Sequence, residues 1–411
     1  MLSRKQAAYC SNGSYAISLE DIGRAALADC VASEQKRFGV SGAELYNPDL
    51  KFHQIIKSGQ IAAIPLVVLF HSYIVVHDEG ITYWKYYYLN YYLGPMLMPL
   101  FFCAAGMSMS RVLKMRSLAF AKSRLASYIW IYIIWSLILG LIELVASGGE
   151  YKGALYTLAD IVSMLIRPTG VLWFLHHLII FIAATKVVSG KSGTTVLGVI
   201  LFFYCVEYYF YTFYLDRFLL NFWFFMLGYY FKCNIEQILL KTRMNTVYGL
   251  FAIYSLWVVA ASNVHALSFP MIACPFGFIG FVWFSRIADR LLGARFLHKT
   301  MIGSDDVFAI YLVHMPFVIA LSRVAVFSKG FVSIVVLKLM SPLCVAFGAL
   351  ILAAVTANWL KRLPWLFYPP RWFARICSDV LGRILHQLRV TVRFLVRMAR
   401  IRMGTLEPGA L

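Results

Sequence analysis

Four ionisable residues that could do acid–base chemistry lie within long apolar stretches: His71, His177, His314 and Glu207. An ionisable side chain is costly inside a bilayer, so such a residue is a functional candidate by default. An imidazole can take a proton from a hydroxyl group near neutral pH, and a carboxylate can orient the imidazole. These residue types therefore indicate base-assisted chemistry on a hydroxyl. For each residue alone, simple packing against a backbone carbonyl is the alternative.

The depth of each residue follows from its place in its stretch, because a helix rises 1.5 Å per residue. His71 is predicted to lie about 20 Å from the inner face, His314 about 17 Å and His177 about 15 Å. Glu207 comes to about 20 Å. All four fall in one layer near the middle of the bilayer or slightly beyond it. We expect a reaction centre there, with His71 and His314 as its catalytic residues.

Aromatic residues accompany two of these histidines at helical spacing. Trp173 precedes His177 by four residues and Tyr311 precedes His314 by three, so each pair shares a helix face. Such aromatics can shape a pocket for a sugar or an acyl chain, although Trp and Tyr more often form an interfacial belt. The residues predicted to bind substrate are Trp173, His177, Glu207 and Tyr311.

Two groups of polar residues lie toward the inner side of the predicted centre. Gln60 is nearly three helical turns before His71, so the two share a face about 16 Å apart. The segment 111–124 carries five Lys or Arg residues, and such residues bind phosphate groups. Ordinary retention on the cytoplasmic side accounts for most of these charges. Arg111 and Arg124, at the ends of their apolar stretches, are the residues we expect to contact a phosphate-bearing cofactor.

The positions of these residues depend on membrane helices. The 411-residue chain is 61% hydrophobic and only 14% charged, which is far from a soluble composition. About ten stretches reach the roughly 20 apolar residues that a span needs: 58–77, 92–111, 124–146, 170–187, 194–213, 217–232, 246–262, 268–287, 303–322 and 333–359. The predicted fold is an all-α membrane protein, a bundle of about ten transmembrane helices.

Basic residues in the loops predict the orientation. Most of them fall in alternate loops, around 111–124, 186–191, 232–243 and 286–299. The positive-inside rule then places both termini in the cytoplasm. We expect a cytoplasmic extension at 1–57, the membrane domain at 58–360 and a cytoplasmic tail at 361–411.

The tail is strongly basic. Ile376, Val380, Ile384, Leu388 and Val392 recur every four residues, and eight Arg residues lie between 371 and 402. This pattern predicts an amphipathic helix on the inner leaflet that binds anionic lipid. The net charge of +19 also permits calmodulin-like or nucleic-acid binding, but we expect no nucleic-acid partner.

The sequence shows no motif for metal binding, disulfide bonding or hydrolysis. The eight cysteines show no regular spacing, so we predict neither a metal site nor a disulfide framework. No glycine-rich phosphate loop, GxSxG elbow or HExxH motif is present. Hydrolase and metalloprotease functions are therefore unsupported.

Six segments in order resemble the integral-membrane acyltransferase family 3, whose members acylate bacterial surface and lipid-linked carbohydrates. The segments are QIAAIPLVVLFHSY (60–73), PLFFCAAGMSMSR (99–111), SRLASYIW (123–130), GVLWFLHHL (170–178), FLLNFWFFMLGYYF (218–231) and VFAIYLVHMPF (307–317). The family's first span usually carries an Arg where this chain has Gln60. A Pro-Tyr usual in the third segment reads Ser127-Tyr128.

The resemblance implies a membrane-bound O-acyltransferase of the bacterial inner membrane. Acetyl-coenzyme A or another acyl-coenzyme A would be the donor substrate, with Gln60, Arg111 and Arg124 on the donor side, and no cofactor would be permanently bound. His71 would act as the base, or would itself relay the acyl group, during O-acetylation of a polysaccharide or lipid-linked glycan. The alternative is a non-catalytic, flippase-like glycan transporter of the same family, which Gln60 favours.

Overall fold

The computed structural model describes residues 48–80, 87–109, 120, 125–146, 150–151, 154–155, 163, 168, 170–210, 215–263, 270–300, 304–327 and 334–402. The chain divides into two units, Met1–Pro48 and Asp49–Leu411. Within the first unit only Pro48 is described, as the first residue of a helix. The predicted N-terminal extension therefore lies almost entirely outside the described residues, and everything below concerns the second unit.

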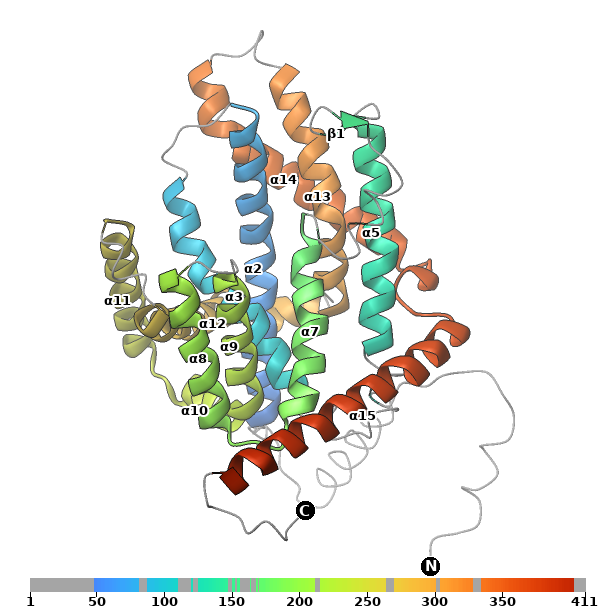
Figure 1. The fold of residues 1–411 in the computed structure, drawn as a ribbon. Helices are drawn as coiled ribbons and strands as arrows, with labels where there is room; N and C mark the ends of the chain where they lie inside the picture. The colour runs from blue at the N-terminus through green and yellow to red at the C-terminus, as the bar shows by residue number, and fades with distance from the viewer. Residues whose placement is uncertain are drawn as a thin grey trace, which may run out of the picture. The chain divides into compact units, whose positions relative to one another are not determined.

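The second unit is built from helices (Figure 1). Those in the predicted membrane stretches are α2 (Pro48–Asp78), α3 (Tyr87–Met109), α5 (Ala126–Ala146), α7 (Leu172–Val188), α8 (Gly193–Phe210), α9 (Asp216–Tyr230), α11 (Met244–Asn263), α12 (Pro270–Thr300), α13 (Ser304–Phe327) and α14 (Ile334–Leu360). The remaining ones are α10 (Lys232–Lys241), the short 3₁₀ helix η7 (Pro364–Leu366) and α15 (Arg371–Arg402). The helical class predicted from composition is thus confirmed.

Seven helices within the described residues are long and apolar enough to cross a membrane. Two further apolar segments are shorter, Ala126–Ile142 within α5 and Leu172–Val188, which is α7. Large apolar side chains also face outward from several of these helices, among them Phe202, Phe203, Leu256 and Phe347. Exposed apolar surface on this scale suits contact with lipid. The chain is a multi-pass membrane protein, whereas the number of ten crossings and the cytoplasmic termini remain predictions.

Two helices extend by ten residues or more beyond their predicted spans. Helix α2 begins at Pro48 instead of near residue 58, and α12 continues to Thr300 through the region predicted as an inner loop. Two contacts hold this part of α12 in place. At the end of the predicted span Arg286 donates to the carbonyl of Thr242, and in the added turns Arg290 donates to the hydroxyl of Tyr248. These cations are bound to the fold, whereas hydropathy had indicated only a charged loop.

A small hairpin is the one sheet in the described part of the chain. Strand β1 (Glu150–Tyr151) pairs antiparallel with β2 (Ala154–Leu155), in the register Glu150 to Leu155 and Tyr151 to Ala154. It lies between α5 and α7. Four strand residues leave the predicted helical class unchanged.

Helices α3 and α9 pack closely because each carries a glycine at their crossing. A Cβ atom added at Gly106 would collide with the carbonyl of Phe225, and one added at Gly228 would collide with the carbonyl of Cys103. Small residues let membrane helices approach closely enough for dispersion contacts between backbones. This crossing holds α3 against α9 beside the aromatic core formed by Phe102, Phe181 and Phe225.

A polar cluster joins α2 to α12 at the end of α2 that precedes the membrane stretch. Lys51 Nζ lies 2.8 Å from one carboxylate oxygen of Asp289, and Gln54 Nε2 donates to the other oxygen at 2.8 Å. Asp289 is only 7% exposed. A buried carboxylate is costly unless it is paired and hydrogen-bonded, so this cluster sets the position of α2 relative to α12.

Candidate active site

The structure brings His71 and His314 together. His71 lies on α2 and His314 on α13, and their ring centroids are 5.3 Å apart at an interplanar angle of 42°. His314 is fully buried, while His71 is half-buried. Their catalytic role remains a prediction, but the two rings form one site in which His71 is the more accessible member.

Hydrogen bonding determines which nitrogen of His314 can act as a base. Its Nδ1 lies 2.7 Å from the carbonyl oxygen of Tyr311, one turn earlier in α13. Because a carbonyl only accepts, we assign the proton of the neutral ring to Nδ1. The buried Nε2 has no hydrogen-bond partner. A buried polar atom without a partner is costly, and in the neutral ring assigned above this nitrogen carries the lone pair.

Tyr311 connects α13 to the start of α7. Its hydroxyl donates to the carbonyl of Val171, the residue just before α7. Gly170, directly before it, has a φ of +51°, a conformation that glycine adopts most easily. The ring of Tyr311 also contacts Phe174 at 5.5 Å between centroids. Tyr311 therefore fixes the N-terminal turn of α7 against His314, a role that spacing alone did not reveal.

The second pair predicted from spacing, Trp173 and His177, also meets. Their ring centroids are 5.3 Å apart, and the His177 ring lies 5.0 Å from that of Phe218 on α9. Consecutive ring contacts run from His314 through Tyr311, Phe174 and Trp173 to His177. One aromatic wall thus connects the two groups of histidines.

His176 belongs to the same region but faces another helix. Its ring contacts Tyr132 on α5 at 5.6 Å, and the Nδ1 atoms of both His176 and His177 are buried without a hydrogen-bond partner. The sequence analysis missed the contribution of α5. The adjacent histidines were the available signal, since residues 100° apart on a helix must face different neighbours.

Glu207 lies on α8, in the predicted stretch, and contacts the start of the next helix. Its Oε1 accepts the backbone N–H of Leu215 at 3.0 Å, just before α9 begins. A carboxylate at a helix N-terminus satisfies an otherwise unpaired donor and interacts favourably with the helix dipole. This contact gives the buried carboxylate a structural role at the start of α9, while its role in binding substrate stays a prediction.

The predicted donor-side residues are only partly described. Gln60 is half-buried on α2, on the helix that carries His71. Arg111 and Arg124 lie outside the described residues. A buried cation that sequence analysis assigned to a loop is Lys186, in the last turn of α7. Its Nζ lies 5.4 Å from the ring centroid of Phe120.

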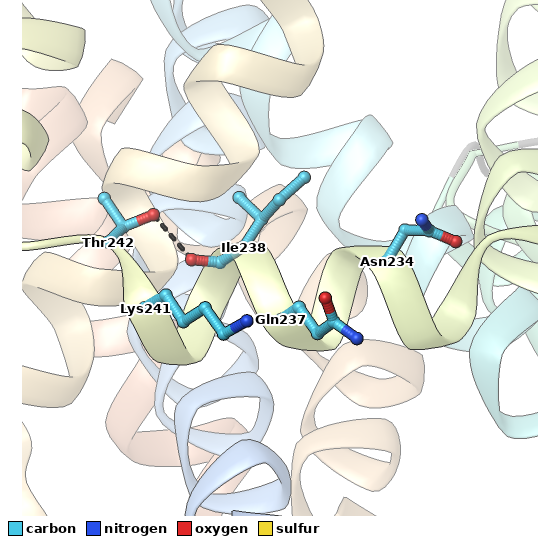
Figure 2. Close-up of a pocket in the computed structure, with 5 residues that line it drawn as sticks. All are labelled: Asn234, Gln237, Ile238, Lys241 and Thr242. Atoms are coloured by element: carbon cyan, nitrogen blue, oxygen red, sulfur yellow. Dashed lines mark hydrogen bonds between the residues drawn. The ribbon is translucent and has the colours of Figure 1, made fainter.

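One surface hollow lies on α10, away from these residues (Figure 2). It is lined by Asn234, Gln237, Ile238, Lys241 and Thr242. The hydroxyl of Thr242 donates to the carbonyl of Ile238 within this group. All five residues come from one helix and the residue that follows it, so the hollow is shallow and its lining includes none of the predicted site residues. The histidine pair, not this hollow, is the candidate active site.

Within the described residues, no group of three or more His, Cys, Asp or Glu could hold a metal ion. The arrangement therefore offers imidazole nitrogens, a tyrosine-supported helix start and an aromatic wall. Such a set suits proton transfer at a hydroxyl group beside a stacked ring.

Comparison with known proteins identifies the family. Residues 56–374 match the family model described as "Acyltransferase domain", in acyltransferase family 3. The match begins in α2 and ends in α15, so it includes His71, His177 and His314. No curated protein and no solved structure matches the chain. Because the family model covers well over half of the sequence, the chain belongs to the acyltransferase 3 family of membrane proteins.

Proposed function

We propose that this membrane acyltransferase transfers an acetyl or other acyl group from acyl-coenzyme A to a hydroxyl of a cell-surface or lipid-linked carbohydrate. The observation that supports this most strongly is the His71–His314 pair, 5.3 Å apart, in which His314 Nε2 is buried without a partner. The proposal includes the bacterial inner membrane as location and both termini in the cytoplasm.

The reaction needs one base and one path for the leaving thiol. An imidazole of the pair removes the proton of the acceptor hydroxyl as its oxygen attacks the thioester carbonyl carbon. The new C–O bond forms and the C–S bond breaks. The thiolate of coenzyme A leaves and receives the proton that the imidazole holds. In the covalent variant, His71 first carries the acyl group and then passes it to the hydroxyl.

Differences in exposure suggest a division of labour within the pair. His71 is partly exposed, whereas His314 is buried and hydrogen-bonded to the Tyr311 carbonyl. His71 would therefore contact the reacting hydroxyl, and His314 would accept the proton or orient His71. A buried neighbour held by a hydrogen bond keeps the accessible base in a productive position.

Binding of both substrates is assigned on chemical grounds. The acceptor carbohydrate would stack on the aromatic wall at Trp173 and Tyr311, near His177, because apolar sugar faces suit aromatic rings. The acyl donor would approach from the α2 end that carries Gln60, with its phosphates at Arg111 and Arg124. No permanently bound cofactor and no metal is required.

Radiolabelled acetyl-coenzyme A, incubated with membranes that contain the protein, tests the enzyme assignment. We expect label to enter glycan with the wild type and to fall at least ~100-fold with His71→Ala, the usual contribution of a general base. His77→Ala is the matched control, because His77 is exposed on the same helix and should leave transfer unchanged. If neither glycan labelling nor coenzyme release depends on His71, the enzyme proposal is wrong.

Gln60 favours one other function, a glycan transporter that performs no chemistry. The family usually has an Arg at this position, and a neutral amide offers no charge to a donor phosphate. A transporter would translocate glycan equally well with and without acyl-coenzyme A, and His71→Ala would leave that movement intact. Measuring glycan translocation beside acyl labelling in the same vesicles separates the two functions.

A further inference from the structure

As far as its side chains are described, up to residue 391, helix α15 packs on the membrane domain through one of its faces. Cys377 and Leu385 are buried on this helix, which contacts α5 and α7 (Figure 1). At its start, the ring of Phe373 lies 5.0 Å from that of Trp130 on α5. Trp130 Nε1 also donates to the carbonyl of Trp365 just ahead of α15. The helix is therefore anchored to the two helices that carry Tyr132, His176 and His177.

An apolar stripe continues this packed face and remains uncovered. Ile376, Val380, Ile384 and Leu388 are 55%, 47%, 48% and 48% exposed. Residues four apart differ by only about 40° around a helix, so these side chains form one band beside the packed residues. Such a contiguous exposed band marks a surface that contacts another apolar phase.

Basic residues flank this band or lie opposite it. Arg371, Arg375 and Arg383 are exposed. Arg371 and Arg375 lie about 140–180° around the helix from the middle of the band. Five more Arg residues follow between 389 and 402 in the sequence. Exposed Trp359, Trp365 and Tyr368 precede the helix, and Trp and Tyr are typical of the membrane–water boundary.

We propose that α15 is an in-plane anchor that binds the surface of a membrane rich in anionic phospholipid. The apolar band enters the outer part of the acyl chains, and the arginines contact the phosphate groups of the lipids. A helix with this division of residues lies in the interface and does not cross it. The charge of the helix selects the lipid, since Arg side chains near the surface are attracted to anionic headgroups. Neither statement depends on acyl transfer.

Single cysteines on α15 provide the test. Val380→Cys and His386→Cys are each placed in the full-length chain after its native cysteines have been replaced, and an unchanged gel-filtration profile serves as the folding control. Both positions are exposed in the protein alone, but they lie about 120° apart around the helix. In nanodiscs that contain phosphatidylglycerol, we expect a charged maleimide to label position 380 several times more slowly than position 386.

Lipid charge is tested in the same assay. Nanodiscs of phosphatidylcholine alone should reduce the protection of position 380. The variant Arg371→Gln, Arg375→Gln, Arg383→Gln should remove the effect of phosphatidylglycerol. A matched loss of three charges at α10 and just after it, Lys232→Gln, Lys241→Gln and Arg243→Gln, should leave it intact.

Four outcomes would overturn the proposal. Equal labelling at positions 380 and 386 in every nanodisc would show that the band does not enter lipid. Equal protection with and without phosphatidylglycerol would refute the selection of anionic lipid. Protection in cell membranes but not in nanodiscs would assign the band to a protein partner. Protection lost on removal of residues 1–47 would assign it to the chain's own N-terminal segment.

Discussion

The two histidines of the pair differ in hydrogen bonding and in exposure. His314 has one nitrogen bound to the Tyr311 carbonyl and the other buried without a partner. His71 keeps part of its surface accessible. The pair thus combines one imidazole that a substrate can reach with one whose protonation state is set by the backbone. This difference could not be inferred from residue type, since both are histidines in apolar stretches.

Gln60→Arg tests the donor side of the site. Adding a guanidinium on the helix face that carries His71 should lower the KM for acyl-coenzyme A by up to about tenfold, the effect of ~1.4 kcal/mol. The rate of acyl transfer at saturating donor should be unchanged or raised. Steady-state kinetics with the purified protein measure both quantities.

Gln237→Arg is the matched control, because Gln237 is exposed on α10 far along the chain from the pair. It should change neither constant. A collapse of activity in Gln60→Arg with normally folded protein would show that Gln60 has a role of its own.

Helices of the bundle pack closely where a glycine of one helix faces the backbone of another. The crossing of α3 and α9 is the clearest, because both Gly106 and Gly228 face backbone carbonyls of the other helix. Helix α9 in turn contacts His177 through Phe218. The crossing therefore positions one side of the aromatic wall.

Gly228→Ala should destabilise the protein, because the added methyl group has no space beside the Cys103 carbonyl. Overpacking of this kind typically costs about 1–3 kcal/mol. The measurement is the midpoint of heat-induced loss of the monodisperse gel-filtration peak in detergent. Gly198→Ala on α8 is the control, since nothing lies within 4 Å of its added Cβ. Equal midpoints for the two variants would contradict the close crossing.

At the scale of the whole molecule, the lengths of two helices bear on how close the site lies to water. Helix α7 has 17 residues and α9 has 15, so they extend only about 26 Å and 22 Å. The hydrocarbon core of a bilayer is about 30 Å thick. Both short helices line the region of His177. Short helices beside a polar site reduce the distance between that site and water, which suits a reaction with a hydrophilic acceptor.

Fusions to alkaline phosphatase, which is active only outside the cytoplasm, test the orientation. We expect activity for a fusion at residue 330, between α13 and α14, and no activity for fusions at Gly190 or after Leu411. The physical reason is the concentration of Lys and Arg in the alternate loops. Fusions to a reporter that fluoresces only in the cytoplasm should give the reverse pattern. Activity after Leu411 would place the tail outside and contradict the predicted topology.

Much of the secondary structure could be predicted because apolar length is a local property. Helices occur in all the predicted membrane stretches, and α15 begins at Arg371 and ends at Arg402, the limits of the predicted tail helix. The errors of the prediction concern the residues at which helices begin and end. Hydropathy alone cannot distinguish a helix that stops at the membrane surface from one that continues into water, as α12 does to Thr300.

Helical spacing also predicted correctly which aromatic ring lies beside each of two histidines. Trp173 contacts His177, and the ring of Tyr311 lies 5.8 Å from that of His314, as expected for residues on one helix face. Rise per residue placed His71 and His314 at similar depth, and the two rings are indeed neighbours. Their chemical roles remain predictions.

The sequence by itself determined the helical class, the apolar stretches and the basic tail helix, and it predicted a depth for each histidine. Only the tertiary structure decided which of them meet: His71 with His314, His177 with Phe218, and Glu207 with the backbone of Leu215. The reason is physical. Depth follows from the constant rise of a helix, but the rotation and neighbours of each helix do not. Lipid-facing and buried surfaces of a membrane helix are both apolar, so the sequence pattern does not distinguish the inside of the bundle from the outside.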